Sequence, residues 1–145
     1  MKIALGADHR GLAYKERIKG ILEKMGHTVI DMGPFTDESV DYPDFGLKVA
    51  HAVADKSADR GVTICWTGNG MNMAANKVRG VRAGMAISVD MAYYTRLHND
   101  ANVLTLSDKY TPKDQLEEIL KTFLETEFEG GRHIARIKKI DEAER

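Results

Sequence analysis

The segment Ile64-Cys65-Trp66-Thr67-Gly68-Asn69-Gly70-Met71-Asn72-Met73-Ala74-Ala75-Asn76 joins an apolar run to a glycine-rich turn and then to a helical pattern. The apolar run 61–65 predicts a buried strand, and residues 71–77 predict a short helix. Cys65, the only cysteine, therefore comes at the carboxyl end of a strand and just before a helix. Helix N–H groups at such a point stabilise anions and favour a thiolate, which indicates a base or nucleophile. A buried structural cysteine is the alternative interpretation.

The same alternation of short apolar runs and amphipathic segments fills the rest of the chain. Strands are predicted at 2–7, 28–31, 61–65, 82–88 and 102–106. Helices are predicted at 11–25, from Pro43 to about Asp55, at 71–77, at 91–97 with Asp90 as N-cap, at 112–124 and at 134–143. This order favours the α/β class, with a mostly parallel five-stranded sheet covered by helices on both faces.

Length and composition restrict the classes of protein that the chain can belong to. With 145 residues, the chain is expected to form one domain over 1–145. Its net charge of −1 offers no electrostatic reason to expect a nucleic acid or an anionic membrane as partner. A single cysteine makes no internal disulfide, so a cytoplasmic location is expected. The sequence shows no signal peptide and no apolar run long enough for a membrane span.

Polar side chains cluster beside the predicted strands. Ligands of parallel α/β sheets bind beyond the carboxyl ends of the strands. Four polar segments are therefore expected to converge on one edge of the sheet: Asp8-His9-Arg10, Cys65–Met71, His98-Asn99-Asp100 and Ser107-Asp108-Lys109.

Five motifs, in the same order along the chain, resemble the type B ribose-5-phosphate isomerases and the related galactose-6-phosphate isomerase subunits. They are Gly6-Ala7-Asp8-His9-Arg10-Gly11, Ser39-Val40-Asp41-Tyr42-Pro43-Asp44, the segment 65–77, Arg96-Leu97-His98-Asn99-Asp100-Ala101-Asn102-Val103-Leu104, and Glu129-Gly130-Gly131-Arg132-His133. The resemblance implies a Rossmann-like three-layer α/β/α sandwich. It also implies aldose–ketose isomerisation of a sugar phosphate, with ribose 5-phosphate to ribulose 5-phosphate as the first expectation and with no metal or organic cofactor.

The resemblance also implies a role for each catalytic position. Cys65 would carry the proton between C1 and C2, and Thr67 and His98 would open the sugar ring. The developing oxyanion would be held by the backbone amides of Gly68, Asn69, Gly70 and Met71, because glycines permit a close approach to the substrate.

The remaining matched positions are implied to bind substrate. Asp8 and Asn99 would hold sugar hydroxyls, and the phosphate would be held by His9, Arg132 and Arg136. Lys109 lies near the place where an arginine often contacts phosphate in the family. Lysine keeps that charge but lacks the forked guanidinium. For the two arginines, the alternative is a basic surface face paired with Glu142 or Glu144.

Some positions depart from the family pattern or have no clear role. Trp66 replaces a small residue, Asn72 stands where serine is frequent, and Ser107-Asp108-Lys109 replaces a glycine-rich, arginine-bearing segment. These departures keep other substrates open, namely an allose, galactose or tetrose phosphate or a non-phosphorylated keto sugar. His27 and His51 are expected to be ordinary surface histidines, while His133 stays undecided.

Two other classes of function are weighed against the isomerase. A non-catalytic phosphate- or nucleotide-binding Rossmann-like module is disfavoured because the chain has neither a Gly-x-Gly-x-x-Gly turn after its first strand nor a Gly-x-x-x-x-Gly-Lys-Ser/Thr loop. A thiol redox enzyme is disfavoured because there is no second cysteine.

The resemblance finally implies a homodimer, sometimes paired into a tetramer, with shared active sites. The segment 98–99, the Lys109 loop or the terminal arginines would reach the Cys65 of a neighbouring subunit, and the C-terminal helix at about 132–143 would pack on that partner. A single sheet domain leaves the crevice beyond its strand ends open on one side. A partner subunit could close this crevice against water, which agrees with the expected dimer.

Overall fold

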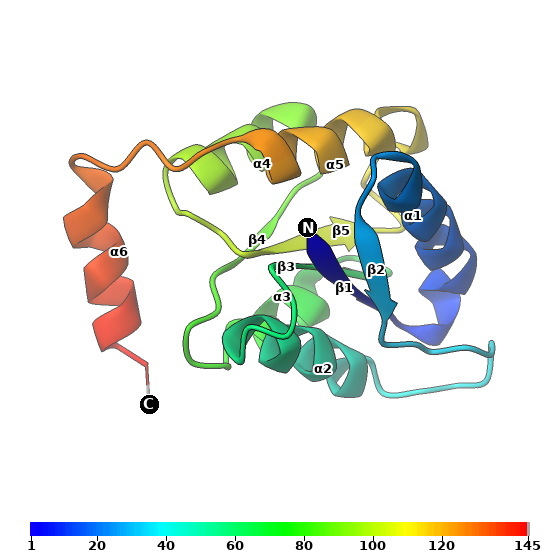
Figure 1. Cartoon of the computed structure of the whole chain (residues 1–145). Coiled ribbons are helices and arrows are strands. Elements are labelled where there is room, and N and C mark those ends of the chain that lie inside the picture. Colours follow the sequence, from blue (N-terminus) through cyan, green and yellow to red (C-terminus); the bar gives the residue numbers. More distant parts are fainter. Residues whose placement is uncertain (145) are drawn as a thin grey trace.

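A five-stranded parallel sheet forms the centre of the molecule in the computed structural model, which describes residues 1–144 (Figure 1). The strands are β1 (Lys2–Ala7), β2 (Thr28–Asp31), β3 (Arg60–Cys65), β4 (Ala83–Met85) and β5 (Val103–Ser107). Their order is β2-β1-β3-β5-β4, and all four pairings are parallel. The predicted parallel sheet is confirmed.

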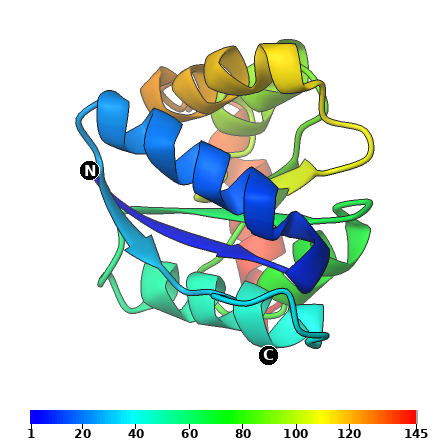
Figure 2. The ribbon, with the colours of Figure 1, turned by 90° about the vertical axis from the view of Figure 1, so that its right-hand side faces the viewer.

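Helices cover both faces of this sheet, which gives the predicted three-layer α/β/α arrangement (Figure 2). One face is covered by α1 (Leu12–Lys24), α4 (Val89–Leu97) and α5 (Leu116–Glu125). The other face is covered by α2 (Tyr42–Ala54) and α3 (Asn69–Ala75). Two short 3₁₀ helices, η1 (His9–Gly11) and η2 (Lys113–Gln115), precede α1 and α5.

The strands read as near-continuous apolar runs because both of their faces are buried. In β1 and β3 every residue after the first is buried. Gly61 of β3 lets α2 approach closely, since a Cβ there would lie 2.6 Å from the Val49 Cγ1 atom. Burial on both faces therefore explains both the apolar pattern and the glycine within it.

Several element boundaries differ from the sequence prediction. β4 ends at Met85 instead of Ser88, because the Ser88 hydroxyl accepts a hydrogen bond from the Met91 N–H at 3.1 Å and begins α4. Ser88, and not Asp90, is therefore the N-cap of this helix. α3 begins at Asn69, two residues before the expected start, directly after the glycine turn.

A fully buried lysine holds the loop that leads into α2. Lys15 Nζ lies 2.7 and 2.9 Å from the two carboxylate oxygens of Asp31 and donates to the Pro34 carbonyl at 2.8 Å. Asp31 also accepts a hydrogen bond from the Gly33 N–H at 2.9 Å. One ion pair thus joins α1, the end of β2 and the following loop.

Replacing Lys15 by methionine is expected to lower the free energy of unfolding by roughly 3 kcal/mol, because Asp31 keeps a largely buried charge without its main partner. Chemical denaturation of the variant measures this change. The matched control is Lys19→Met, since Lys19 lies 3.9 Å from Asp31 and is one-third exposed. That control should change stability by less than about 1 kcal/mol. Equal losses in the two variants would contradict the role assigned to Lys15.

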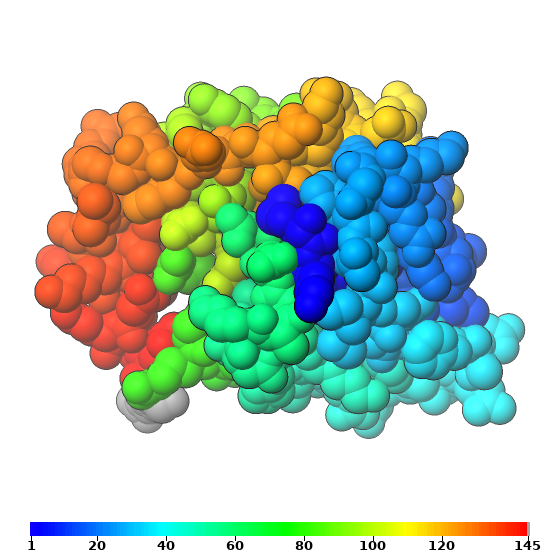
Figure 3. Space-filling model, in the orientation of Figure 1, coloured from blue at the N-terminus to red at the C-terminus, as the bar shows by residue number. Residues whose placement is uncertain are grey.

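The C-terminal helix α6 (His133–Glu142) stands apart from the sandwich at the end of an extended segment (Figure 1). Its polar links to the body include a 2.9 Å ion pair between Arg82 and Asp141 and a 2.9 Å hydrogen bond from the Gly80 N–H to Glu144. A hollow of about 490 Å³ lies between α6 and the segment 76–81, and Figure 3 shows an opening on this side. Two isoleucines of α6, Ile134 and Ile140, are more than half exposed.

No helix formed by residues 1–144 is both long enough and apolar enough to cross a membrane.

Candidate active site

Cys65 lies at the carboxyl edge of the sheet, as its position at the end of an apolar run predicts. It is 5% exposed and is the register partner of Ser107 in β5. The loop after β5 is fastened to it: the Asp108 N–H donates to the Cys65 carbonyl, and the Lys109 N–H donates to the Trp66 carbonyl, both at 3.0 Å. These bonds hold the thiol in a defined place between two loops.

The glycine turn after Cys65 presents free backbone donors. Gly68 has a φ of +88°, a left-handed conformation that favours glycine, and it turns the chain into α3. The Asn69 N–H is bonded to Thr67 Oγ1 at 3.3 Å. Among residues 1–144, however, the N–H groups of Gly70 and Met71 have no acceptor. Two free amides one turn from a thiol can stabilise a developing oxyanion.

Tyr42 lies directly over this turn. A Cβ on Gly70 would collide with the end of the Tyr42 ring, so a larger residue there would have to displace that side chain. Sequence reasoning did not find this contact, because the two residues are far apart in the chain and neither periodicity nor spacing links them.

Asp8 and His9 follow β1 and lie at the same edge as Cys65. The Asp8 N–H donates to the Ile64 carbonyl at 3.1 Å, next to the thiol. The Asp8 side chain is largely buried, and its Oδ1 atom accepts from the Gly11 N–H at 2.7 Å. His9 Nδ1 accepts from the Val40 N–H at 3.1 Å. A neutral His9 therefore carries its proton on Nε2, which suits a donor to phosphate.

The structure does not bring the remaining site residues to this edge. His98 is the C-cap of α4, which returns from the carboxyl edge, and it precedes the start of β5. β5 alone spans about 13 Å, at roughly 3.3 Å per residue. His98 and Asn99 thus lie at the amino edge, with Arg132 and Arg136 on the neighbouring α6 side. The expectation that all four polar segments converge on one edge within a single chain is wrong for 98–100.

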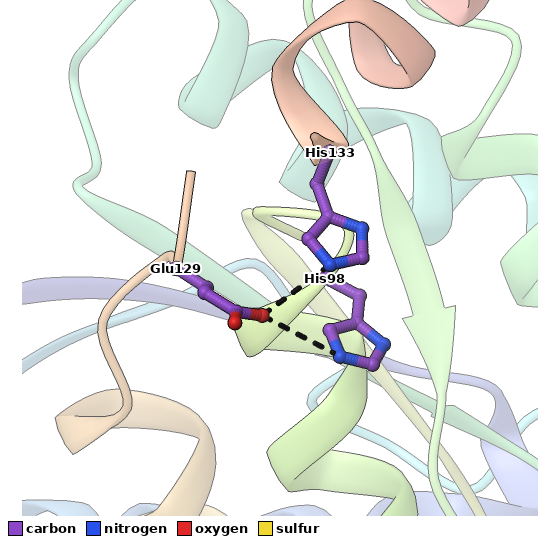
Figure 4. A group of neighbouring side chains, drawn as sticks. All are labelled: His98, Glu129 and His133. Atoms are coloured by element: carbon purple, nitrogen blue, oxygen red, sulfur yellow. Dashed lines mark ion pairs between the residues drawn. The ribbon is translucent and has the colours of Figure 1, made fainter. Parts of the chain in front are cut away.

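At the amino edge, His98 and His133 form a stacked pair beside Glu129 (Figure 4). The two ring centroids are 4.3 Å apart and the ring planes are inclined by 16°. Glu129 Oε2 lies 3.7 Å from His98 Nε2 and 3.3 Å from His133 Nε2. Burial lowers the pKa of His133 below its usual value, and the nearby His98 and arginines add to this effect, while Glu129 opposes it. These causes favour a neutral His133 imidazole.

The same three residues are the group within 1–144 whose ligand atoms lie close enough together to hold a metal ion. A metal lies in the plane of each imidazole that binds it, about 2.0–2.1 Å from the nitrogen for zinc. The planes of two stacked rings inclined by only 16° meet far from both rings, so one ion cannot lie in both planes at bonding distance from both nitrogens. The arrangement therefore suits a stacked histidine pair facing a carboxylate better than a metal centre.

The terminal arginines are exposed on α6 and at its start. Glu142 faces Lys138 at 3.9 Å, and Glu144 accepts from the Gly80 N–H. Within the described part of the chain, neither Arg132 nor Arg136 forms an ion pair. The alternative that pairs these arginines with Glu142 or Glu144 thus finds no support in the structure.

The positions that depart from the family pattern lie at the carboxyl edge. Trp66 is 42% exposed, and the Arg10 guanidinium lies 5.8 Å from its ring centroid. Lys109 Nζ lies 5.2 Å from the Tyr110 ring centroid. The Asn72 Oδ1 atom is buried and has no hydrogen-bond partner among residues 1–144.

A surface hollow of about 780 Å³ lies between α2 and the preceding loop, and its lining includes Met32, Val40, Phe45 and Lys48. None of the predicted catalytic or substrate-binding residues lines it. This hollow therefore does not mark the candidate site, which the chemistry of the residues identifies.

Comparisons with known proteins agree with this geometry. A family model described as Ribose/Galactose Isomerase matches residues 3–140. The ribose-5-phosphate isomerase B of Escherichia coli is 40% identical, over 96% of this chain and 93% of its own. The structure of Clostridium thermocellum ribose-5-phosphate isomerase B is 50% identical, with a TM-score of 0.95 over 98% of this chain and 96% of that one. The Mycoplasma genitalium enzyme, solved with bound ribulose-5-phosphate, is 43% identical, with a TM-score of 0.92 over 97% and 94% of the two chains.

Proposed function

Because the chain belongs to the ribose/galactose isomerase family, we propose that it interconverts ribose 5-phosphate and ribulose 5-phosphate. The observation that carries the proposal is the buried Cys65 beside the free amides of Gly70 and Met71. Ribulose-5-phosphate bound to the Mycoplasma genitalium relative supports the choice of substrate. The whole chain is proposed to act as one isomerase domain, and the single cysteine favours a cytoplasmic location.

In the proposed mechanism, Thr67 and His98 open the sugar ring, and Cys65 then acts on the open-chain sugar. Its thiolate takes the proton from C2, and the electrons of that bond form the C1–C2 double bond while the aldehyde oxygen becomes an oxyanion. The amides of Gly70 and Met71 stabilise this oxyanion. A proton then passes from O2 to O1, and the thiol returns its proton to C1, which yields the ketose and restores the thiolate.

The substrate contacts are assigned by position. Asp8 and the partner's Asn99 are proposed to hold sugar hydroxyls. The phosphate is proposed to lie against His9, whose Nε2 proton is available, and against Arg132 and Arg136 of a second subunit.

The working unit is proposed to be a homodimer with two shared sites. Within one chain, Cys65, Thr67 and Asp8 lie at the carboxyl edge of the sheet and His98 lies at the amino edge. An active site that uses both Cys65 and His98 therefore needs residues from two chains. A twofold axis would bring the amino edge of each subunit to the carboxyl edge of its partner. The exposed isoleucines of α6, Ile134 and Ile140, support its packing on the partner.

A coupled assay against a panel of sugar phosphates, with and without a chelator, tests the proposed function. We expect ribose 5-phosphate to give the highest kcat/KM and the chelator to change nothing. A higher kcat/KM on an allose, galactose or tetrose phosphate would move the assignment to that substrate. Absence of turnover on every sugar phosphate would contradict the isomerase itself.

The phosphate-binding role of α6 makes a separate prediction. Arg132→Ala and Arg136→Ala should each raise KM for ribose 5-phosphate while changing kcat less, because each removes a charged hydrogen bond worth roughly 1.5–3 kcal/mol. Steady-state kinetics measures both constants. Lys139→Ala, another exposed cation of α6, is the matched control and should leave KM unchanged. An unchanged KM in both arginine variants would return these residues to a surface role.

A further inference from the structure

The group formed by His98, Glu129 and His133 contains two residues to which the proposed mechanism gives no role. His133 is 5% exposed and stacks on the His98 ring, while Glu129 turns its carboxylate toward both imidazoles (Figure 4). A buried histidine and a carboxylate that both contact a catalytic imidazole require an explanation beyond packing.

Glu129 is held firmly relative to His98. The Glu129 N–H donates to the carbonyl of Leu97, the last residue of α4, at 3.0 Å. This bond joins the segment before α6 to the end of α4, next to the residue that the carboxylate faces. His133 lies four residues further along, so its Nε2 atom also reaches Glu129 Oε2. The backbone of Glu129 is thus held next to His98, and its half-exposed carboxylate faces both imidazoles.

Both contacts to the carboxylate use the Nε2 atoms of the two rings. With the Nε2 side of the His98 ring turned toward Glu129, Nδ1 lies on the opposite side of the ring, as Figure 4 shows. Stacking on His133 restricts rotation of the same ring. The His98 side chain is still one-third exposed, so its free nitrogen can meet a substrate.

We infer that Glu129 and His133 are positioning residues that orient His98 so that its Nδ1 atom, and not Nε2, acts on the sugar ring. This inference rests on the proposed function and deepens it. It assigns a role to the carboxylate and the second imidazole of the terminal Glu129–His133 segment, and it names the nitrogen that performs ring opening.

The chemistry of ring opening suits this arrangement. The protonated His98 gives its Nδ1 proton to the ring oxygen O4 of ribose 5-phosphate as the C1–O4 bond breaks, and the bonding pair goes to O4. The anomeric hydroxyl gives its proton to water as C1=O forms, and His98 regains a proton from solvent. The Glu129 carboxylate stabilises the imidazolium during this exchange, as the carboxylate of a catalytic triad does.

His133 also contacts Arg132, one of the proposed phosphate-binding residues, so it could serve phosphate binding instead of positioning His98. The Arg132 Nε atom lies 3.5 Å from His133 Nε2, the limit of a hydrogen bond, whereas Glu129 Oε2 lies at 3.3 Å. One Nε2 atom cannot donate to the carboxylate and accept from the guanidinium at once. In the structure His133 Nε2 accepts from Arg132 at that limit, so His133 donates to Glu129 only when the contact with Arg132 is broken, whereas its stacking on His98 holds in either case.

The experiment separates ring opening from proton transfer at carbon. Ribulose 5-phosphate carries its phosphate on O5, so it cannot close a five-membered ring, and deuterium exchange at its C1 in heavy water needs only Cys65. In Glu129→Gln, turnover of ribose 5-phosphate should fall about tenfold or more. The C1 exchange rate should stay within about twofold of the native rate, because positioning for general acid catalysis affects only the earlier step.

The matched control is Glu127→Gln, an exposed carboxylate two residues earlier that should change neither rate. His133→Phe keeps a flat ring for stacking and should retain more ribose 5-phosphate turnover than His133→Ala. Equal loss of both rates in Glu129→Gln, or loss of neither, would overturn the inference. If the native protein turns over no sugar phosphate, the proposed function fails instead. The two failures are therefore distinguishable.

Discussion

Replacing Cys65 by alanine is expected to lower kcat for ribose 5-phosphate by about three orders of magnitude or more, because the variant lacks the thiol that is proposed to carry the proton between C1 and C2. The fold should persist, since the change removes one sulfur atom from a side chain at the edge of the core. Coupled assays measure the rate, and thermal unfolding together with ribulose 5-phosphate binding checks that the site is intact.

The same assignment predicts chemical modification. Iodoacetamide should inactivate the native protein by alkylating Cys65, which is the only thiol in the chain. Ribulose 5-phosphate should slow that inactivation if it covers the thiol. An alanine variant that keeps most of its turnover would show that the base lies elsewhere.

A mixture of two inactive variants, Cys65→Ala and His98→Ala, is expected to recover activity once the subunits exchange. Each hybrid dimer would contain one site with an intact Cys65 and an intact partner His98. Random assortment of equal amounts makes half of the dimers hybrid, so about one quarter of the native activity should return in a twofold dimer. The two groups lie at opposite edges of one sheet, which is why separate chains can supply them.

The control for this experiment is a mixture of Cys65→Ala with Thr67→Ala. Both changes fall on the same edge, so no hybrid site contains both native residues and no activity should return. If the first mixture stays inactive although mass spectrometry shows exchange, the sites are not shared. A fully active monomer in the ultracentrifuge at assay concentration would contradict the shared site directly.

Much of the fold could be predicted from local patterns. Residues 2–7 and 28–31 were expected as strands with the bounds that the structure shows. The strand predicted at 82–88 was too long. Its last residue, Ser88, begins a helix instead, because its hydroxyl caps α4. Such a cap depends on one side-chain hydrogen bond, which hydrophobic periodicity does not report.

The carboxyl-edge part of the site was equally predictable. Cys65 follows an apolar run and precedes a glycine turn, and a parallel strand followed by a helix always places such a residue at that edge. The positions of Thr67 and Asp8 follow from the same rule, because both come just after parallel strands. Strand direction alone is enough for this inference.

Local patterns could not place His98, Glu129 and His133. α4 runs antiparallel to the strands, so the residues that follow it lie at the amino edge. The sequence motif around His98 does not indicate this change of direction. The contact between Glu129 and the two imidazoles depends on the hydrogen bond to Leu97 and on the stacking of two rings from distant segments. Short-range sequence patterns thus determined the sheet, its helices and the thiol's edge. The separation of the site into two halves arose only when distant segments packed, because no local preference encodes which segments will meet.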